Sequence, residues 1–193
     1  MSRKANTMAP KVRILKEDII AAAVEIVRKD SAEALNARTV AAALGCSTQP
    51  VFSNFRTMEE LKIAVEAAAE AAYQDFVRRE VEDGQYPPYK ASGMAYIRFA
   101  KEEKELFKLL YMRDRTEEEI PEETEDLNRM AQTVSRNTGL GEAEAKLFHV
   151  EMWAFVHGIA AMYATGYLSL DWELISRMLT DAYLGLRKRY EDR

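Results

Sequence analysis

Apolar residues recur at helical spacing near the start of the chain. Within residues 16–30 they fall at positions i, i+4, i+7 and i+8, which form one face of an amphipathic helix: Ile19, Ala23, Ile26 and Val27. This pattern predicts a first helix over residues 16–30.

Two short helices joined by a tight turn are predicted next. Asn36 can cap the first, and Gly45 stands where the end of a helix favours a left-handed residue. The second is predicted to begin with Ser47 as its N-cap and Pro50 in its first turn, where a missing N–H costs nothing. We expect its apolar residues to belong to the core: Val51, Phe52 and Phe55.

The rest of the chain also has helical periodicity. The segment "TMEE" at 57–60 is a capping box that predicts a fourth helix reaching about residue 82, and "DGQYPPY" at 83–89 predicts a loop. Further helices are predicted at about 90–103, 104–113, 122–137, 142–168 and 171–190. We therefore expect an all-α fold with nine helices and no strand.

Two segments could suggest other functions. The carboxylate-rich run at 114–126 lacks the alternating ligands and the glycine of a calcium loop, so it predicts a solvated loop leading into a helix near Pro121. The segment 152–170 has no charged residue, but small and polar residues dilute its apolarity and no basic flank sets an orientation. We expect it to be a buried helix interface and not a membrane span.

The last two helices carry stripes suited to helix packing. Small residues recur at intervals of 4, 3 and 4 in the first: Ala154, Gly158, Ala161 and Thr165. Residues of the second step by 3, 4, 3 and 4: Trp172, Ile175, Leu179, Ala182 and Leu186. Two chains could join these helices in a four-helix bundle across a two-fold axis, and packing within one chain is the alternative.

Charge divides the chain into a basic front and an acidic body. The net charge is −5, yet residues 1–56 hold nine Lys or Arg against five Asp or Glu. Local positive charge of this kind suits contact with a polyanion, so we expect 1–56 to form one functional unit and 57–193 another. Cys46 is the only cysteine and the basic start has no apolar segment after it, which together favour a reducing, cytoplasmic location.

The turn "GCSTQPVFSNF" at 45–55 has the proportions of a helix-turn-helix, whose second helix enters the DNA major groove. Polar residues are interleaved with apolar ones in its second helix, so one face can be buried while the other offers donors and acceptors. Gln49 suits a bidentate contact with adenine. A helical hairpin buried in the core is the plainer alternative.

Residues 14–65 resemble the DNA-binding domain of TetR-family transcriptional regulators. The resemblance is carried by the segments "EDIIAAAVEIVRKDSAEAL", "NARTVAAALG", "CSTQPVFSNF" and "TMEELKIAV". More weakly, "WAFVHGIAAMYATG" resembles a tryptophan, histidine and glycine pattern of some members' C-terminal domains. The resemblance implies a homodimer with N-terminal DNA-reading modules and a C-terminal part that dimerises and often holds a small ligand.

The resemblance also implies roles for single residues. Arg38 matches a position that touches phosphate, and Phe52 and Met58 stand where the family usually has a tyrosine and a lysine that contact the DNA backbone. Other cations could replace those contacts: Arg56, Lys62 or the basic arm of Arg3, Lys4, Lys11 and Arg13. The DNA-binding residues expected are Arg38, Ser47, Thr48, Gln49, Phe52, Ser53, Asn54 and Arg56.

A ligand cavity is expected among the C-terminal helices, although the same residues would describe a filled core: Met94, Ile97, Phe107, Tyr111, Trp153 and His157. No local motif supports catalysis, a metal or a cofactor. The function expected is that of a dimeric repressor that binds a pseudo-palindromic DNA operator and is released by a small-molecule effector. The alternative is an adaptor of the same fold whose C-terminal part binds a protein.

Overall fold

The computed structural model describes residues 14–116 and 124–191. The prediction of an all-α fold is confirmed for this part of the chain, which has nine α-helices, one short 3-10 turn at Ala32–Ala34 and no strand. The helices are α1 Lys16–Asp30, α2 Ala37–Ala43, α3 Gln49–Asn54, α4 Met58–Glu82, α5 Pro88–Glu102, α6 Lys104–Tyr111, α7 Glu125–Thr138, α8 Glu142–Thr165 and α9 Trp172–Glu191.

Local signals set both ends of α2. The Oδ1 atom of Asn36 accepts hydrogen bonds from the amides of Arg38, at 3.0 Å, and Thr39, at 3.1 Å, which confirms the predicted cap of α2. Gly45, just past α2, has a φ of 64°, a left-handed conformation that glycine adopts without steric cost. The start of α2 and the turn between α2 and α3 are therefore each encoded by a local residue.

Helix α3 differs from the prediction in two ways. It begins at Gln49, and its N-cap residue is Thr48 and not Ser47, with no side-chain capping bond. Val51 and Phe55 are buried as predicted, but Phe52 has half its surface exposed, so its assignment to the core was wrong. In a helix of only six residues, one face is filled by Val51, and Phe52 lies one residue further round.

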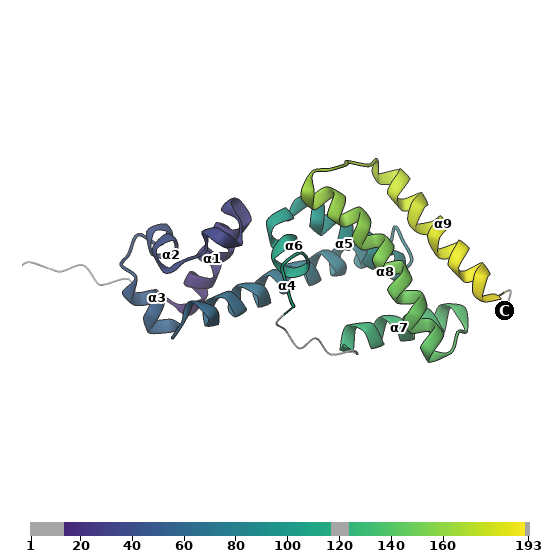
Figure 1. Cartoon of the computed structure of the whole chain (residues 1–193), viewed down its shortest axis with the longest axis horizontal. Coiled ribbons are helices and arrows are strands. Elements are labelled where there is room, and N and C mark those ends of the chain that lie inside the picture. The colour runs from purple at the N-terminus through teal and green to yellow at the C-terminus, as the bar shows by residue number, and fades with distance from the viewer. Residues whose placement is uncertain (1–13, 117–123, 192–193) are drawn as a thin grey trace, which may run out of the picture.

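Helix α4 connects the N-terminal helices to the C-terminal ones. The hydroxyl of Thr57 accepts from the amide of Glu60 at 3.2 Å, while the Glu60 carboxylate accepts from the Arg56 amide at 2.7 Å. These two bonds fix the start of a helix of 25 residues, which is about 37 Å long. Figure 1 shows α4 running from the cluster of α1, α2 and α3 into the C-terminal helices.

The C-terminal helices pack around α5, which contacts α4, α6, α8 and α9. Helix α5 begins at Pro88, two residues before the predicted start, because proline is well suited to the first helical position. Helix α8 ends at Thr165, before the predicted 168, because Gly166 takes a left-handed conformation with a φ of 69°. The predicted helix start near Pro121 lies outside the described residues.

Contacts between α1 and the C-terminal helices complete the fold. Helix α1 packs on both α4 and α6, and the Nε atom of Arg28 donates to the Glu103 carboxylate at 2.7 Å. One continuous group of buried apolar residues extends from Ile19 in α1 to Leu179 in α9. The N-terminal helices are thus packed directly against the body of the protein.

Replacing Asn36 with Ala should lower the free energy of unfolding by about 1 kcal/mol, because two amides at the start of α2 lose their acceptor. Urea unfolding measures this change. Asn36→Asp, which keeps an acceptor oxygen, is the matched control and should stay close to wild type. Equal losses in both variants would show that the cap bond is not what stabilises α2.

Candidate DNA-binding surface and ligand cavity

The outer face of α3 is exposed. Gln49, Phe52 and Ser53 stand at i, i+3 and i+4 and are open to solvent, whereas Val51 on the other face is fully buried. This short helix is anchored by its apolar face and presents a mixed polar and aromatic surface outward. The arrangement brings three of the predicted DNA-contacting residues of α3 onto one surface, whereas the fourth, Asn54, is partly buried.

The polar side chains of α3 are not equally available. The Ser53 hydroxyl donates to the Gln49 carbonyl at 2.8 Å, and the Asn54 amide donates to the Pro50 carbonyl at 2.8 Å. Both side chains therefore use a donor on backbone carbonyls of α3 itself. The Gln49 side chain makes no hydrogen bond to any described residue, so both its donor and its acceptor can meet a ligand.

Positive charge flanks α3. Arg38 on α2 and Arg56 just after α3 are exposed, and neither forms an ion pair with a described residue. Lys62 lies 3.8 Å from the Glu59 carboxylate, which offsets part of its charge, and Met58 packs against the core. The basic arm proposed to assist them, with Arg3, Lys4, Lys11 and Arg13, lies outside the described residues.

A cavity of about 800 Å³ lies among the C-terminal helices. Tyr111 and Trp153 line it, as predicted. Met94, Ile97 and Phe107 are fully buried and form the core behind the wall. Several lining residues come from distant helices, and no local pattern in the sequence predicts them: Tyr73, Tyr89, Lys90, His149, Thr180 and Tyr183.

His157 stands behind the cavity wall. Its Nδ1 atom is 2.9 Å from the hydroxyl of Tyr96, and its ring stacks on Trp153 with centroids 5.1 Å apart. Desolvation lowers its pKa, so the imidazole is neutral near pH 7. These contacts show a histidine that positions two lining residues, Tyr96 and Trp153.

Aromatic rings form much of the cavity wall. Tyr96 and Tyr111 lie 5.0 Å apart between ring centroids, and Tyr73 meets both rings edge-on. At the other end, the Tyr89 hydroxyl is 3.0 Å from Nδ1 of His149. Burial raises the pKa of all four tyrosines, so their hydroxyls stay neutral and act as hydrogen-bonding groups.

The outward face of α8 is apolar and open. From the predicted stripe of small residues, Ala154, Gly158 and Thr165 are exposed and Ala161 is partly so. A Cβ atom added at Gly158 would meet nothing within 4 Å. Larger apolar side chains with more than a third of their surface exposed extend this face: Leu147, Val150, Trp153 and Phe155.

The predicted stripe on α9 packs mainly inside its own chain. Ile175 and Leu179 are buried, and Trp172 is partly buried against the same core. Ala182 and Leu186 are partly buried against a second apolar cluster, which includes Phe148 and Tyr190. Leu174 and Leu184 are the apolar residues that α9 exposes. Only the α8 part of the expected interface is therefore free on the surface of a single chain.

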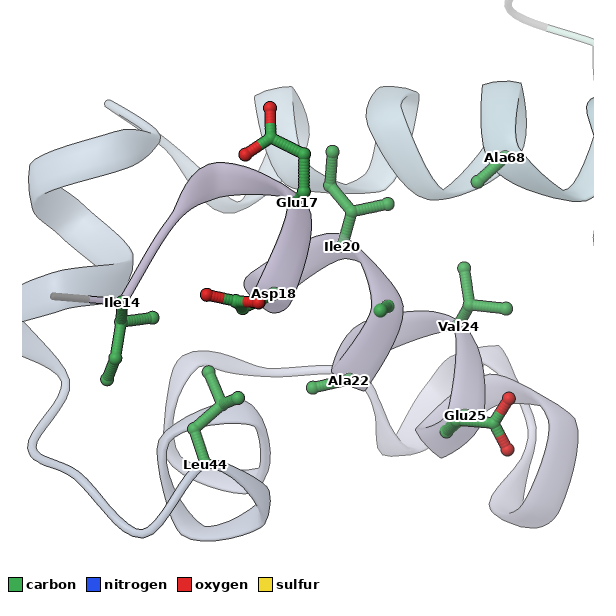
Figure 2. A pocket seen from close by; sticks show the side chains of 10 residues that line it. Ile14, Glu17, Asp18, Ile20, Ala22, Val24, Glu25, Leu44 and Ala68 are labelled. Atoms are coloured by element: carbon green, nitrogen blue, oxygen red, sulfur yellow. The ribbon is translucent and has the colours of Figure 1, made fainter. Parts of the chain in front are cut away.

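A second hollow, of about 860 Å³, runs along α1 (Figure 2). It is shallow and apolar, and its three acidic residues come from α1 alone. Asp18 accepts from the Leu15 amide at 2.9 Å and Glu25 pairs with Arg28. These carboxylates serve α1 itself, and their charge opposes contact with phosphate on this side.

Within the described residues, no helix combines the length and apolarity needed to cross a bilayer, α8 included. The same part of the chain contains no cluster of three or more His, Cys, Asp or Glu able to hold a metal ion. Much of the acidic run at 114–126 falls at 117–123, outside the described residues. Cys46 is a free, partly exposed thiol in the turn before α3.

Comparison with known proteins identifies the C-terminal part. Residues 89–183, which include all of α5 after Pro88 and the tryptophan, histidine and glycine of α8, match the family model of the tetracycline repressor-like C-terminal domain. Together with the all-α fold, this match supports a regulator of the TetR family. A search of curated proteins found no match.

His149 should make the free energy of unfolding depend on pH. Desolvation lowers the pKa of His149, so below about pH 6.5 the unfolded chain takes up a proton that the folded chain resists. Stability should be full above about pH 6.5 and fall as the pH decreases toward the lowered folded-state pKa. Urea unfolding at a series of pH values should show a shallower fall for His149→Gln than for wild type. An unchanged slope would contradict the desolvation of this ring.

Proposed function

We propose that the chain is a sequence-specific, DNA-binding transcriptional repressor that acts as a homodimer and is released by a small molecule. The observation that carries this proposal is α3, a short helix with one buried and one exposed face, placed at the start of an α4 that continues to the wall of a cavity. Residues 1–56 read DNA and 57–193 dimerise and hold the effector. Catalysis has no part in this function.

Recognition of DNA is divided among the exposed residues. Gln49 forms two hydrogen bonds with the edge of an adenine in the major groove. Arg38 and Arg56 contact phosphates on either side, which positions the helix without reading sequence. Phe52 supplies apolar contact, for which a thymine methyl group is a suitable partner. Thr48 and Ser47 lie beside the start of α3, near the phosphate backbone.

Dimerisation joins the open α8 faces of two chains. The small residues allow close approach of the helix backbones, and the exposed apolar side chains around them are removed from water. Leu174 and Leu184 extend the buried surface onto α9. A two-fold axis through this interface places the two α3 helices about 34–36 Å apart, so that both face one side of a pseudo-palindromic operator.

Release follows from the contacts of α4. Tyr73 of α4 lines the cavity, and three turns earlier Leu61 of the same helix packs in the core beside α1. A ligand that fits the cavity better at one angle of α4 moves the DNA-reading helices with it. The change in the free energy of DNA binding cannot exceed the difference between the ligand's binding free energies for the two angles of α4.

Replacing Gln49 with Ala should relax specificity at a defined pair of symmetry-related base pairs, by about 1–3 kcal/mol at each. Selection from random duplexes followed by sequencing measures the change. Gln132→Ala, an exposed glutamine on α7, is the matched control and should select the wild-type site. Failure of the wild-type protein to enrich any symmetric site at low salt would contradict the proposed function.

Replacing Ala154 with Arg should weaken the dimer at least tenfold, because a long charged side chain is placed within the stripe of small residues. Sedimentation equilibrium measures the dissociation constant. Ala67→Arg, at an exposed position of α4, should leave it unchanged. A wild-type chain that sediments as a 22.0 kDa monomer would contradict the dimer and favour another protein as the partner of this face.

A further inference from the structure

The cavity holds one positive charge that no described carboxylate balances. Its charged lining residues are Lys90, Asp126 and Arg129, and the last two pair with each other. Lys90 has no ion-pair partner in the described part of the chain. The histidine of the lining, His149, is neutral near pH 7 because desolvation lowers its pKa.

The ammonium of Lys90 is fixed in place by neutral groups. Its Nζ atom donates to the Thr180 hydroxyl at 2.8 Å and lies 4.9 Å from the centre of the Tyr86 ring. The Thr180 hydroxyl itself donates to the Ser176 carbonyl at 3.0 Å, so its oxygen is turned toward the lysine. Partial burial without a nearby carboxylate lowers the pKa of Lys90, because burial makes the charged ammonium less favourable. An anionic ligand beside the ammonium would offset this desolvation cost.

The aromatic wall continues from this charge. Tyr89 and Tyr96 stand seven residues apart on the same face of α5, and Tyr111, Trp153 and Tyr183 complete the surround. From Lys90 to Tyr96 the rise along α5 is about 9 Å. That length suits a flat body of two fused rings with a charged group at one end.

We propose that the effector is an aromatic carboxylate, whose carboxylate pairs with Lys90 and whose rings lie between the tyrosines and Trp153. This inference rests on the proposed function, since it assigns a chemical class to the ligand of the same cavity. The ammonium of Lys90 favours an anionic ligand. The neutral aromatic rings of the wall favour a planar one.

Three probes with the same naphthalene ring and different charge test the assignment: 2-naphthoate, 2-naphthalenemethanol and 2-naphthylmethylamine. Isothermal titration calorimetry should give a dissociation constant for the naphthoate about tenfold to a hundredfold lower than for the neutral alcohol, with the amine weakest. Lys90→Gln should abolish the difference between naphthoate and alcohol. Lys104→Gln, an exposed lysine on α6, should preserve it.

Several results would overturn the proposal. The alcohol could bind as tightly as the naphthoate, the preference could survive in Lys90→Gln, or no probe could bind at all. Selection of a symmetric DNA site does not depend on any probe. A wild-type chain that enriches such a site but binds none of the three would overturn the ligand class and leave DNA reading in place. Naphthoate binding with the predicted preference but without release of DNA would support the ligand class and contradict the release mechanism.

Discussion

The continuity of α4 is the constraint on which the rest of the structure depends. Leu61, Val65 and Ala69 are fully buried along its first half beside α1, and Tyr73 and Phe76 pack against Phe99 of α5 along its second half. Its 25 residues contain neither proline nor glycine, so the ladder of backbone hydrogen bonds is unbroken. The cavity end and the end that carries α3 therefore belong to one unbroken helix.

The far end of α4 is held by a different kind of contact. Glu80 is buried and accepts two hydrogen bonds from Arg98 of α5, at 2.9 and 3.3 Å, and the Arg98 guanidinium lies 4.4 Å from the centre of the Trp172 ring at the start of α9. This bidentate pair links α4, α5 and α9 around one charge. The cavity is built on the same three helices together with α6, α7 and α8, so its shape and the angle of α4 are not independent.

Local chemistry made much of the fold predictable. The caps at Asn36 and Thr57, the left-handed Gly45 and the apolar face of α1 are each encoded within a few residues, and the structure confirms them. It was less predictable which neighbour each helix face would contact. Ile175 and Leu179 have the spacing of a packing stripe, but spacing alone cannot say whether the partner helix belongs to the same chain. Lys90, Tyr89 and Thr180 come together only through the packing of α5 against α9, which no local pattern records.

In the proposed function, a two-fold dimer sets the spacing of two α3 helices and a ligand in the cavity changes that spacing. Cys46, the only cysteine, lies just before α3 and is partly exposed, so one nitroxide label can be attached there without mutation. Pulsed dipolar EPR on the labelled protein should give a single distance near one turn of DNA, about 35 Å, that narrows with operator DNA and shifts when effector is added. Absence of any dipolar signal, or a distance that neither DNA nor effector changes, would contradict a dimer whose α3 spacing responds to the cavity.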